Sequence, residues 1–195
     1  MPDVLAGDGR LRLGEPLPPG AHAYVDADWA RGREGPVAAL IVDGPDPNAT
    51  AARALAAVAG DVAELVGGRE PESIEVRGDG AIARLVRTLT GASSRADRAP
   101  DVVVDTSGTA ASATDALRRV ADLGLVVIAA AVRDPVKLSL YADLHVRGLE
   151  LVCLAPDAER AAVADVDTTT LSETLSVVSE DGELDPGAAW YRVGG

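Results

Sequence analysis

Aromatic side chains are nearly missing from this chain of 195 residues. It contains no phenylalanine, and aromatic residues make up only 3% of it, whereas hydrophobic residues reach 47%. The hydrophobic content is therefore mostly alanine, valine and leucine, and there is enough of it to form a real core. Small aliphatic side chains of this kind are typical of helices packed on a sheet of valine-rich strands.

Positive charge is also scarce. The chain has 18 lysine and arginine residues against 31 aspartate and glutamate residues, which gives a formal net charge of −13. Proteins that bind the phosphate backbone of nucleic acids concentrate lysine and arginine. The composition therefore argues against a nucleic-acid partner.

Few side chains are suited to bind a transition metal. Cys153 is the only cysteine, and His22 and His145 are the only histidines. A zinc site needs three or four ligands, so these three residues, far apart in the sequence, would all have to converge. We expect no metal site and no disulfide framework, and we expect Cys153, in the apolar run LELVCL, to be buried and unreactive.

Long hydrophobic runs are absent as well. No run approaches the 18 apolar residues of a membrane-spanning helix, and no basic-then-apolar leader opens the chain. We expect a soluble, cytoplasmic protein with no membrane partner.

Through its middle the chain alternates strand-like and helix-like segments. Continuous apolar runs predict buried strands, and apolar residues at helical spacing predict helices. The expected strands are 36–42, 73–76, 101–105, 123–132 and 149–154, and the expected helices are 49–66, 81–90 and 110–122, with Asn48 capping the first helix and Thr109 or Ser112 the last. This alternation is the pattern of βαβ units on a parallel sheet.

Both ends of the chain are predicted to be β-rich. Strand-like segments lie at 11–13, 22–25, 176–178 and 189–193, the last two separated by Asp-Gly turn signals. Trp29, Trp190 and Tyr191 fall in these ends, and we expect them to pack together unless they mark a partner surface.

The stretch GDGAIA, residues 78–83, joins an expected strand to an expected helix. Gly78 permits a tight turn, Gly80 lets the backbone approach a pyrophosphate closely, and the small Ala83 suits helix–strand packing. The helix N-terminus at Ala81 points free N–H groups at an anion. This is the G-x-G-x-x-A pattern of a dinucleotide-binding loop in the strand–turn–helix setting that it requires.

A second set of polar residues follows the strand DVVVD. These residues stand at the C-terminal end of a parallel strand, where open α/β sheets bind ligands. The candidate crevice for a cofactor or small ligand is formed by Gly78, Asp79, Gly80, Ala81, Asp105, Thr106 and Ser107. Asp79 places a carboxylate where phosphates would lie, and an ordinary strand–helix turn with a capping hydroxyl is the alternative for the second set.

His145 lies in YADLHVRG, close in sequence to Tyr141, Asp143 and Arg147. One hypothesis is a residual acid/base site. The simpler alternative is a surface helix with ion pairs, and we favour it because no partner of known geometry is evident. No catalytic residue is identified.

The segments DVVVDTSGTAASATDALRRVADLGLVVIAAA and LYADLHVRGLELV, preceded by GDGAIA, resemble the nucleotide-binding half of the medium-chain dehydrogenases/reductases, the zinc alcohol and sorbitol dehydrogenase superfamily. The resemblance covers residues 48–154. It implies an α/β fold, with a shortened Rossmann-like parallel sheet flanked by helices over residues 48–171. Residues 1–47 and 172–195 are expected to form a small β-rich appendage, the whole being a single compact unit.

The chain departs from this family in two ways. Residues 1–47 stand where the family has a catalytic domain bearing zinc ligands, and the linker 91–100 replaces two strands with their helices. In the family's strand order 3-2-1-4-5-6, this loss leaves strands 1, 4, 5 and 6 contiguous, with helix 81–90 as a right-handed crossover between neighbours. The lost flank is the one that holds the adenosine ribose, and PVAALIV is expected to cover the new edge.

The resemblance and the departures together predict a degenerate dehydrogenase-like protein that has lost zinc and NAD chemistry. We expect an accessory or interaction protein, or a small-metabolite-binding protein, set in a biosynthetic pathway and requiring no cofactor. The alternative is an active NAD(P)-dependent oxidoreductase of this type, completed by dimerisation or by a partner subunit. The expected partners are a second copy, a heteromeric protein partner or a small-molecule ligand.

Overall fold

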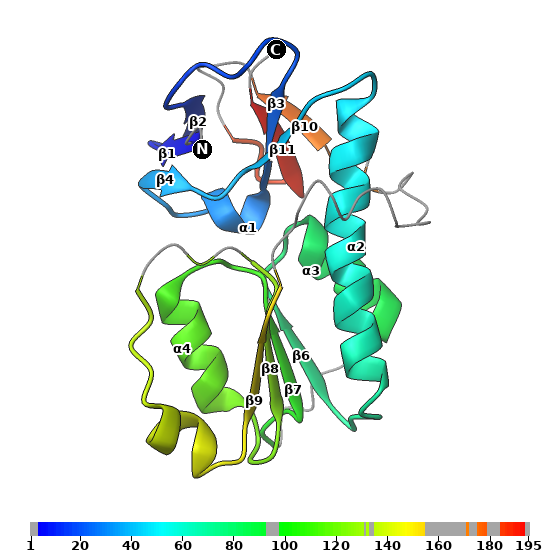
Figure 1. Cartoon of the computed structure of the whole chain (residues 1–195), viewed down its shortest axis with the longest axis vertical. Helices are drawn as coiled ribbons and strands as arrows, with labels where there is room; N and C mark the ends of the chain where they lie inside the picture. The colour runs from blue at the N-terminus through cyan, green and yellow to red at the C-terminus, as the bar shows by residue number, and fades with distance from the viewer. Residues whose placement is uncertain are drawn as a thin grey trace. The chain divides into compact units, whose positions relative to one another are not determined.

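The computed structural model (Figure 1) describes residues 4–92, 98–130, 132, 135–154, 171, 175–178 and 184–193. The chain divides into two compact units. The first comprises residues 1–57, 79–81 and 156–195, and the second comprises residues 58–78 and 82–155. No helix in the described ranges has the length and apolarity needed to cross a membrane.

The second unit is built on a four-stranded parallel sheet in the order β6-β7-β8-β9. These strands are β6 (Ile74–Arg77), β7 (Val102–Asp105), β8 (Leu125–Ile128) and β9 (Glu150–Cys153). The contiguous order expected from the sequence is confirmed, and α3 (Ala81–Thr90) is the direct crossover from β6 to β7. Strands β7 and β8 are buried at every residue, which explains their continuous apolar runs.

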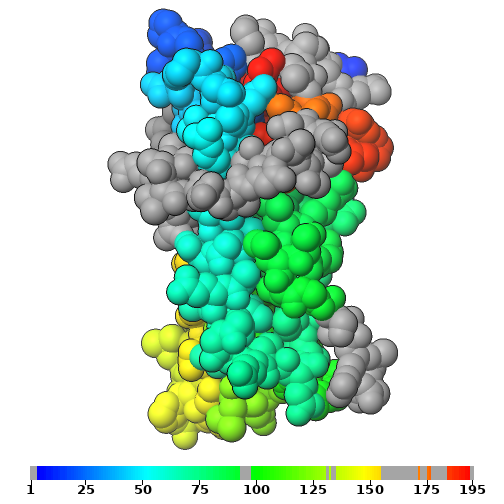
Figure 2. All heavy atoms as spheres, turned by 90° about the vertical axis from the view of Figure 1, so that its right-hand side faces the viewer, coloured from blue at the N-terminus to red at the C-terminus, as the bar shows by residue number. Residues whose placement is uncertain are grey.

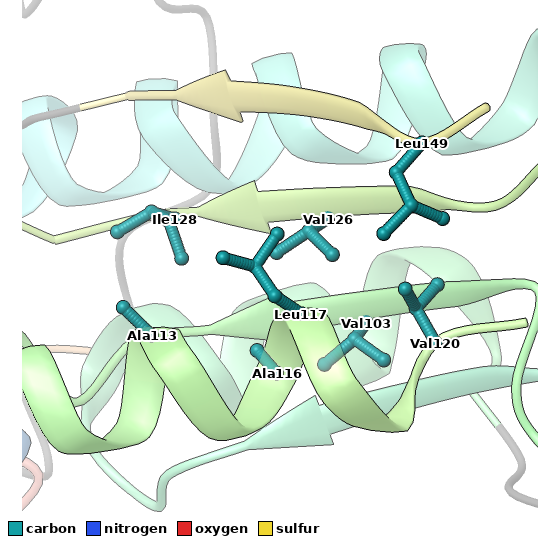
Figure 3. Packing of buried hydrophobic residues seen from close by; sticks show 8 residues of the cluster. All are labelled: Val103, Ala113, Ala116, Leu117, Val120, Val126, Ile128 and Leu149. Atoms are coloured by element: carbon teal, nitrogen blue, oxygen red, sulfur yellow. The ribbon is translucent and has the colours of Figure 1, made fainter. Parts of the chain in front are cut away.

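Helix α4 (Ala110–Arg119) packs on one face of this sheet. Figure 3 shows Leu117 reaching from α4 toward Val103 and Val126, within a cluster completed by Ala113, Ala116, Val120, Ile128 and Leu149. On the opposite face, α3 lies beside the part of α2 (Pro47–Gly67) that belongs to this unit, as Figures 1 and 2 both show. Of the two caps considered for α4, the structure uses Thr109, whose side chain accepts from the Ser112 amide.

The amino ends of β6 and β7 are joined by reciprocal hydrogen bonds. Asp101 Oδ2 accepts from the amides of Glu72 and Ser73 at 2.9 and 3.0 Å, and the Asp101 amide donates to Ser73 Oγ at 3.2 Å. Arg98 donates to the same carboxylate oxygen at 3.0 Å. Burial would raise the pKa of Asp101, but these hydrogen bonds and the Arg98 guanidinium outweigh it, so the pKa is lowered.

The first unit contains two sheets and the short helix α1 (Ala27–Ala30). One sheet has the order β2-β1-β4, from β1 (Val4–Gly7), β2 (Arg10–Leu13) and β4 (Gly35–Val37). The other has the order β10-β11-β3-β5, from β3 (His22–Asp26), β5 (Leu40–Val42), β10 (Leu175–Val178) and β11 (Trp190–Val193). Both chain ends therefore contribute strands to one sheet.

Four aromatic residues lie in the core of this unit. Tyr24 and Trp190 stack with ring centroids 5.5 Å apart, and Trp29, Trp190 and Tyr191 are all buried. Burial raises the pKa of both Tyr24 and Tyr191. The three end-segment aromatics are therefore core residues rather than an exposed pair, and Trp190 stacks on Tyr24.

The prediction of one buried strand over residues 36–42 is wrong. β4 ends at Val37 and pairs with β1, whereas β5 begins at Leu40 and pairs with β3, so two partners in different sheets divide the run. Neither strand joins the parallel sheet, so PVAALIV does not cover its β6 edge.

Two smaller predictions are also corrected. Asp46, not Asn48, caps α2 by accepting from the Ala49 amide at 3.1 Å, while Asn48 accepts from the Tyr24 hydroxyl. Cys153 is exposed rather than buried, because β9 is the last strand of its sheet among the described residues. The segment PDAERAAVADV, residues 156–166, for which the sequence suggests a helix, lies outside the described residues.

The substitution Asp101→Asn tests the link between β6 and β7. Because the folded-state pKa is below the unfolded value of about 3.9, the stabilisation is present above that pH and is lost as the pH falls through the folded-state pKa. We expect the variant to lose about 1 kcal/mol of unfolding free energy at pH 7, and the difference from wild type to shrink as the pH falls below about 4.

Urea titrations at several pH values measure this difference. Asp115→Asn is the matched control, because Asp115 is half exposed and pairs with Arg77 at the surface. A loss that is equal for the two variants, or independent of pH for Asp101→Asn, would contradict the assignment.

Candidate functional site

The seven residues of the predicted crevice are divided between the units. Asp79, Gly80 and Ala81 belong to the first unit, whereas Gly78 and the segment 105–107 belong to the second.

The backbone N–H groups of the glycine loop already have an anionic acceptor from the same chain. The Asp79 amide donates to Asp28 at 2.8 Å (Oδ1) and 2.9 Å (Oδ2), and the Gly80 amide donates to Asp28 Oδ2 at 2.9 Å. Asp28 is only 7% exposed. Its carboxylate receives the loop's amides in the way that a phosphate oxygen would.

A second carboxylate, that of Asp26, occupies the space where a side chain at Gly80 would lie. A Cβ at this position would lie 1.7 Å from Oδ1 and 2.6 Å from the carboxyl carbon of Asp26. Gly80 therefore admits the buried Asp26 side chain, which is 1% exposed. The group that approaches the Gly80 backbone closely is thus a side chain of the same protein.

Local sequence positions these two carboxylates. Asp26 is the last residue of β3 and caps α1, because its side chain accepts from the Asp28 amide at 2.9 Å. This cap places Asp28 in the first turn of α1, where the helix dipole favours a negative charge. Arg31 adds a partner to Asp28 at 3.7 Å. The sequence analysis identified neither residue, and the available signal was Asp-Ala-Asp at the end of a buried strand.

The N-terminus of α3 is also occupied. The Ala81 amide donates to the Ala189 carbonyl at 3.0 Å, and the Ala27 amide donates to the same oxygen at 3.0 Å. Each backbone N–H from Asp79 to Ala81 thus has a protein acceptor. A dinucleotide pyrophosphate at this loop would have to compete for these amides next to two buried carboxylates.

The turn after β7 is held by its own side chains. Both the amide and the hydroxyl of Thr106 donate to the Arg77 carbonyl, at 3.1 and 2.9 Å. Asp105 Oδ1 accepts from the Ser107 amide at 3.1 Å and from Ser112 Oγ at 2.8 Å. Asp105 is fully buried, and its Oδ2 has no hydrogen-bond partner in the described part of the chain. The turn therefore binds Asp105 to Ser107 and Thr106 to Arg77, and it leaves one oxygen of the buried Asp105 carboxylate without a partner among the described residues.

Residues near His145 form surface interactions. The His145 ring stacks on Tyr141 with centroids 5.7 Å apart, Asp143 accepts from the Ser139 amide, and Arg147 pairs with Asp122 at 2.8 Å. This is the ion-paired surface segment that the sequence favoured. Within the described residues, no group of three or more histidine, cysteine, aspartate or glutamate side chains is arranged to hold a metal ion.

Comparisons with known proteins identify the fold. No protein-family profile matches the chain, and no curated protein matches its sequence. Among solved structures, Escherichia coli L-idonate 5-dehydrogenase matches with a TM-score of 0.53 and 16% identity, covering 84% of this chain and 64% of that one. The chain thus spans less than two thirds of that enzyme.

Two further solved structures are similar. A zinc-binding dehydrogenase from Sinorhizobium meliloti bound to NADP matches with a TM-score of 0.52 and 13% identity, over 92% of this chain and 78% of that one. TarJ from S. aureus in complex with NADPH matches with a TM-score of 0.54 and 9% identity, over 98% and 97%. At these identities the similarity establishes the fold alone: the chain has a medium-chain-dehydrogenase-like fold with a Rossmann-like parallel sheet.

Proposed function

We propose that this protein keeps the dehydrogenase fold but does not bind NAD(P), and acts as an accessory or interaction protein. The observation that carries the proposal is the Asp28 carboxylate, which accepts the amides of Asp79 and Gly80 in place of a pyrophosphate. The glycine loop then serves to hold segments of the first unit together.

The free energy of the hydrogen bonds that a dinucleotide would displace supports this proposal. A dinucleotide would have to displace hydrogen bonds to a charged acceptor, each contributing about 1.5–3 kcal/mol. It would also bring its own negative charge beside the buried Asp26 and Asp28. Because Asp28 is tethered to the loop by the fold, it competes at a high effective concentration.

Cofactor binding is the first test. We expect the melting temperature of the wild-type protein to stay unchanged with millimolar NAD, NADP or their reduced forms. A ligand bound at 100 times its dissociation constant would instead stabilise the fold by about 2.7 kcal/mol, which thermal-shift measurement detects. A clear shift, or turnover of an alcohol or aldehyde with NAD(P), would support the alternative of an oxidoreductase completed by a second subunit.

Replacing the internal anion is the second test. Asp28→Ala leaves two amides without their acceptor, so we expect a loss of about 2–4 kcal/mol in unfolding free energy. Asp28→Asn keeps one acceptor oxygen and should recover part of this loss. The matched control is Asp43→Ala, which removes an exposed carboxylate and should have little effect. If Asp28→Ala were as stable as the control, the loop would not depend on this carboxylate.

Asp105 favours small-metabolite binding as a second candidate function. A fully buried carboxylate oxygen without a partner is costly, and such groups are often retained for a ligand. Asp105→Asn removes this charge, so we expect unfolding free energy to rise by about 1 kcal/mol. In a thermal-shift screen of small amines and polyols, a ligand of this site stabilises the wild type and not the variant. A fall in the variant's stability would show that Asp105 is purely structural.

A further inference from the structure

A hollow in the second unit lies between α4 and the segment 137–147, both on the left in Figure 1. It has a volume of about 280 Å³. Its lining includes three apolar side chains and three cationic ones, which are Leu117, Leu138, Ala142, Arg118, Lys137 and Arg147. Pockets for drug-sized ligands measure roughly 300 Å³ or more and combine apolar side chains with a few polar groups. This hollow therefore suits a smaller molecule that has both an apolar and a charged part.

Two of the three cations have no partner within the chain. Arg118 and Lys137 are exposed, and neither makes a hydrogen bond or an ion pair in the part of the chain that the structure describes. The next residue of α4 behaves differently, because Arg119 binds both carboxylate oxygens of Glu75, at 3.0 and 2.9 Å. The positive charges that line the hollow are thus available to a ligand.

These two cations are unusual in so acidic a chain. Lys137 is the only lysine, and the formal net charge is −13. An unpaired lysine and an unpaired arginine beside one hollow make a local positive site in a protein that otherwise repels anions. The planar guanidinium of arginine binds carboxylate and phosphate groups through two parallel hydrogen bonds, and lysine adds a compact charge with three donors.

The third cation holds the hollow in shape. Arg147 donates to the Leu117 carbonyl at 2.6 Å and to the Val120 carbonyl, so its guanidinium attaches the segment 137–147 to the C-terminal end of α4. Leu138 packs against the apolar cluster that contains Leu117. A hollow fixed in this way on both sides needs little rearrangement to bind a ligand, which favours affinity.

One carboxylate also lines the hollow, that of Asp143. Its Oδ2 accepts from the Ser139 amide at 2.8 Å, and Ser139 Oγ accepts from the Ala142 amide at 3.2 Å. These bonds fix the start of the π-helical segment η1 (Leu140–His145). The two unpaired cations outnumber this carboxylate, so the hollow favours a ligand with one anionic group over a highly charged one.

From these observations we propose that the hollow binds a small organic anion. Its carboxylate or phosphate group lies between Arg118 and Lys137, and its short apolar part lies on Leu117, Leu138 and Ala142. Inorganic phosphate would leave the apolar side chains uncovered, and a neutral alkyl compound would leave the cations without a partner. The site shares no residue with the glycine loop or with the turn after β7, so it can fail without the proposed function failing.

Four matched probes test the proposal. Hexanoate and hexyl phosphate carry both parts of the expected ligand, whereas hexanol lacks the charge and inorganic phosphate lacks the apolar part. In NMR titrations of the full chain, we expect hexanoate or hexyl phosphate to bind at one molecule per chain, at least about tenfold more tightly than either control. The tighter of the two identifies the anionic group. Binding of neither at about 10 mM, or equal binding of the controls, would overturn the proposal.

Substitutions locate the site. Arg118→Gln and Lys137→Gln should each weaken binding of the tighter probe about fivefold, and the double variant about 20-fold or more. Asp143→Asn should strengthen it about two- to threefold, because a repelling charge is removed. The matched control is Arg53→Gln, which removes an exposed arginine of α2 and should leave the affinity unchanged. An equal loss in the control would show unspecific attraction of anions and would contradict the site.

The single lysine provides an independent measurement. Acetic anhydride modifies exposed amines, and peptide mass spectrometry follows the modification of Lys137 alone. We expect a saturating concentration of the tighter probe to slow this modification at least about threefold, because the bound anion occupies the ammonium group. Hexanol at the same concentration should have no effect. An unchanged rate with the saturating anion would show that the bound probe does not contact Lys137, and the assignment would be wrong.

Discussion

The first unit depends on the bonds that the Asp28 carboxylate accepts from the glycine loop. This unit is assembled from residues 1–57, 79–81 and 156–195, so its middle segment is only three residues long. Those three residues are held by Asp28 and by the Ala189 carbonyl, and Gly80 leaves room for Asp26. Charge-assisted hydrogen bonds at a buried site are strong enough to fix so short a segment.

The same backbone geometry can therefore hold two different anions. A strand, a glycine turn and a helix N-terminus offer converging N–H groups, and these groups bind a phosphate oxygen or a carboxylate equally well by geometry. The fold is that of medium-chain dehydrogenases, but the acceptor at the loop is part of the chain. The residues at the site, and not the fold, determine an activity, because proteins of one fold have many different functions.

Sequence patterns predicted the parallel sheet well but did not indicate the two carboxylates at the glycine loop, for a physical reason. The strands from β6 to β9 and the bounds of α3 follow from local apolar runs and a glycine turn, which are visible in short windows. Asp26 and Asp28 contact the glycine loop only because pairing between distant segments brings residues 26–28, 79–81 and 189 together. The division of residues 36–42 and the exposure of Cys153 likewise depend on which strands are neighbours, a property that no local window contains.

The pairing of β3 with β11 has a consequence for the order of events during synthesis. Asp26 is opposite Trp190, so the central pair of that sheet joins residues from nearly the full length of the chain. The parallel sheet uses only residues 74–153 and can assemble while the ribosome is still adding the remainder. β3 can pair with β5 early, but its other edge must wait for β11, which leaves that edge without its partner strand until late in synthesis.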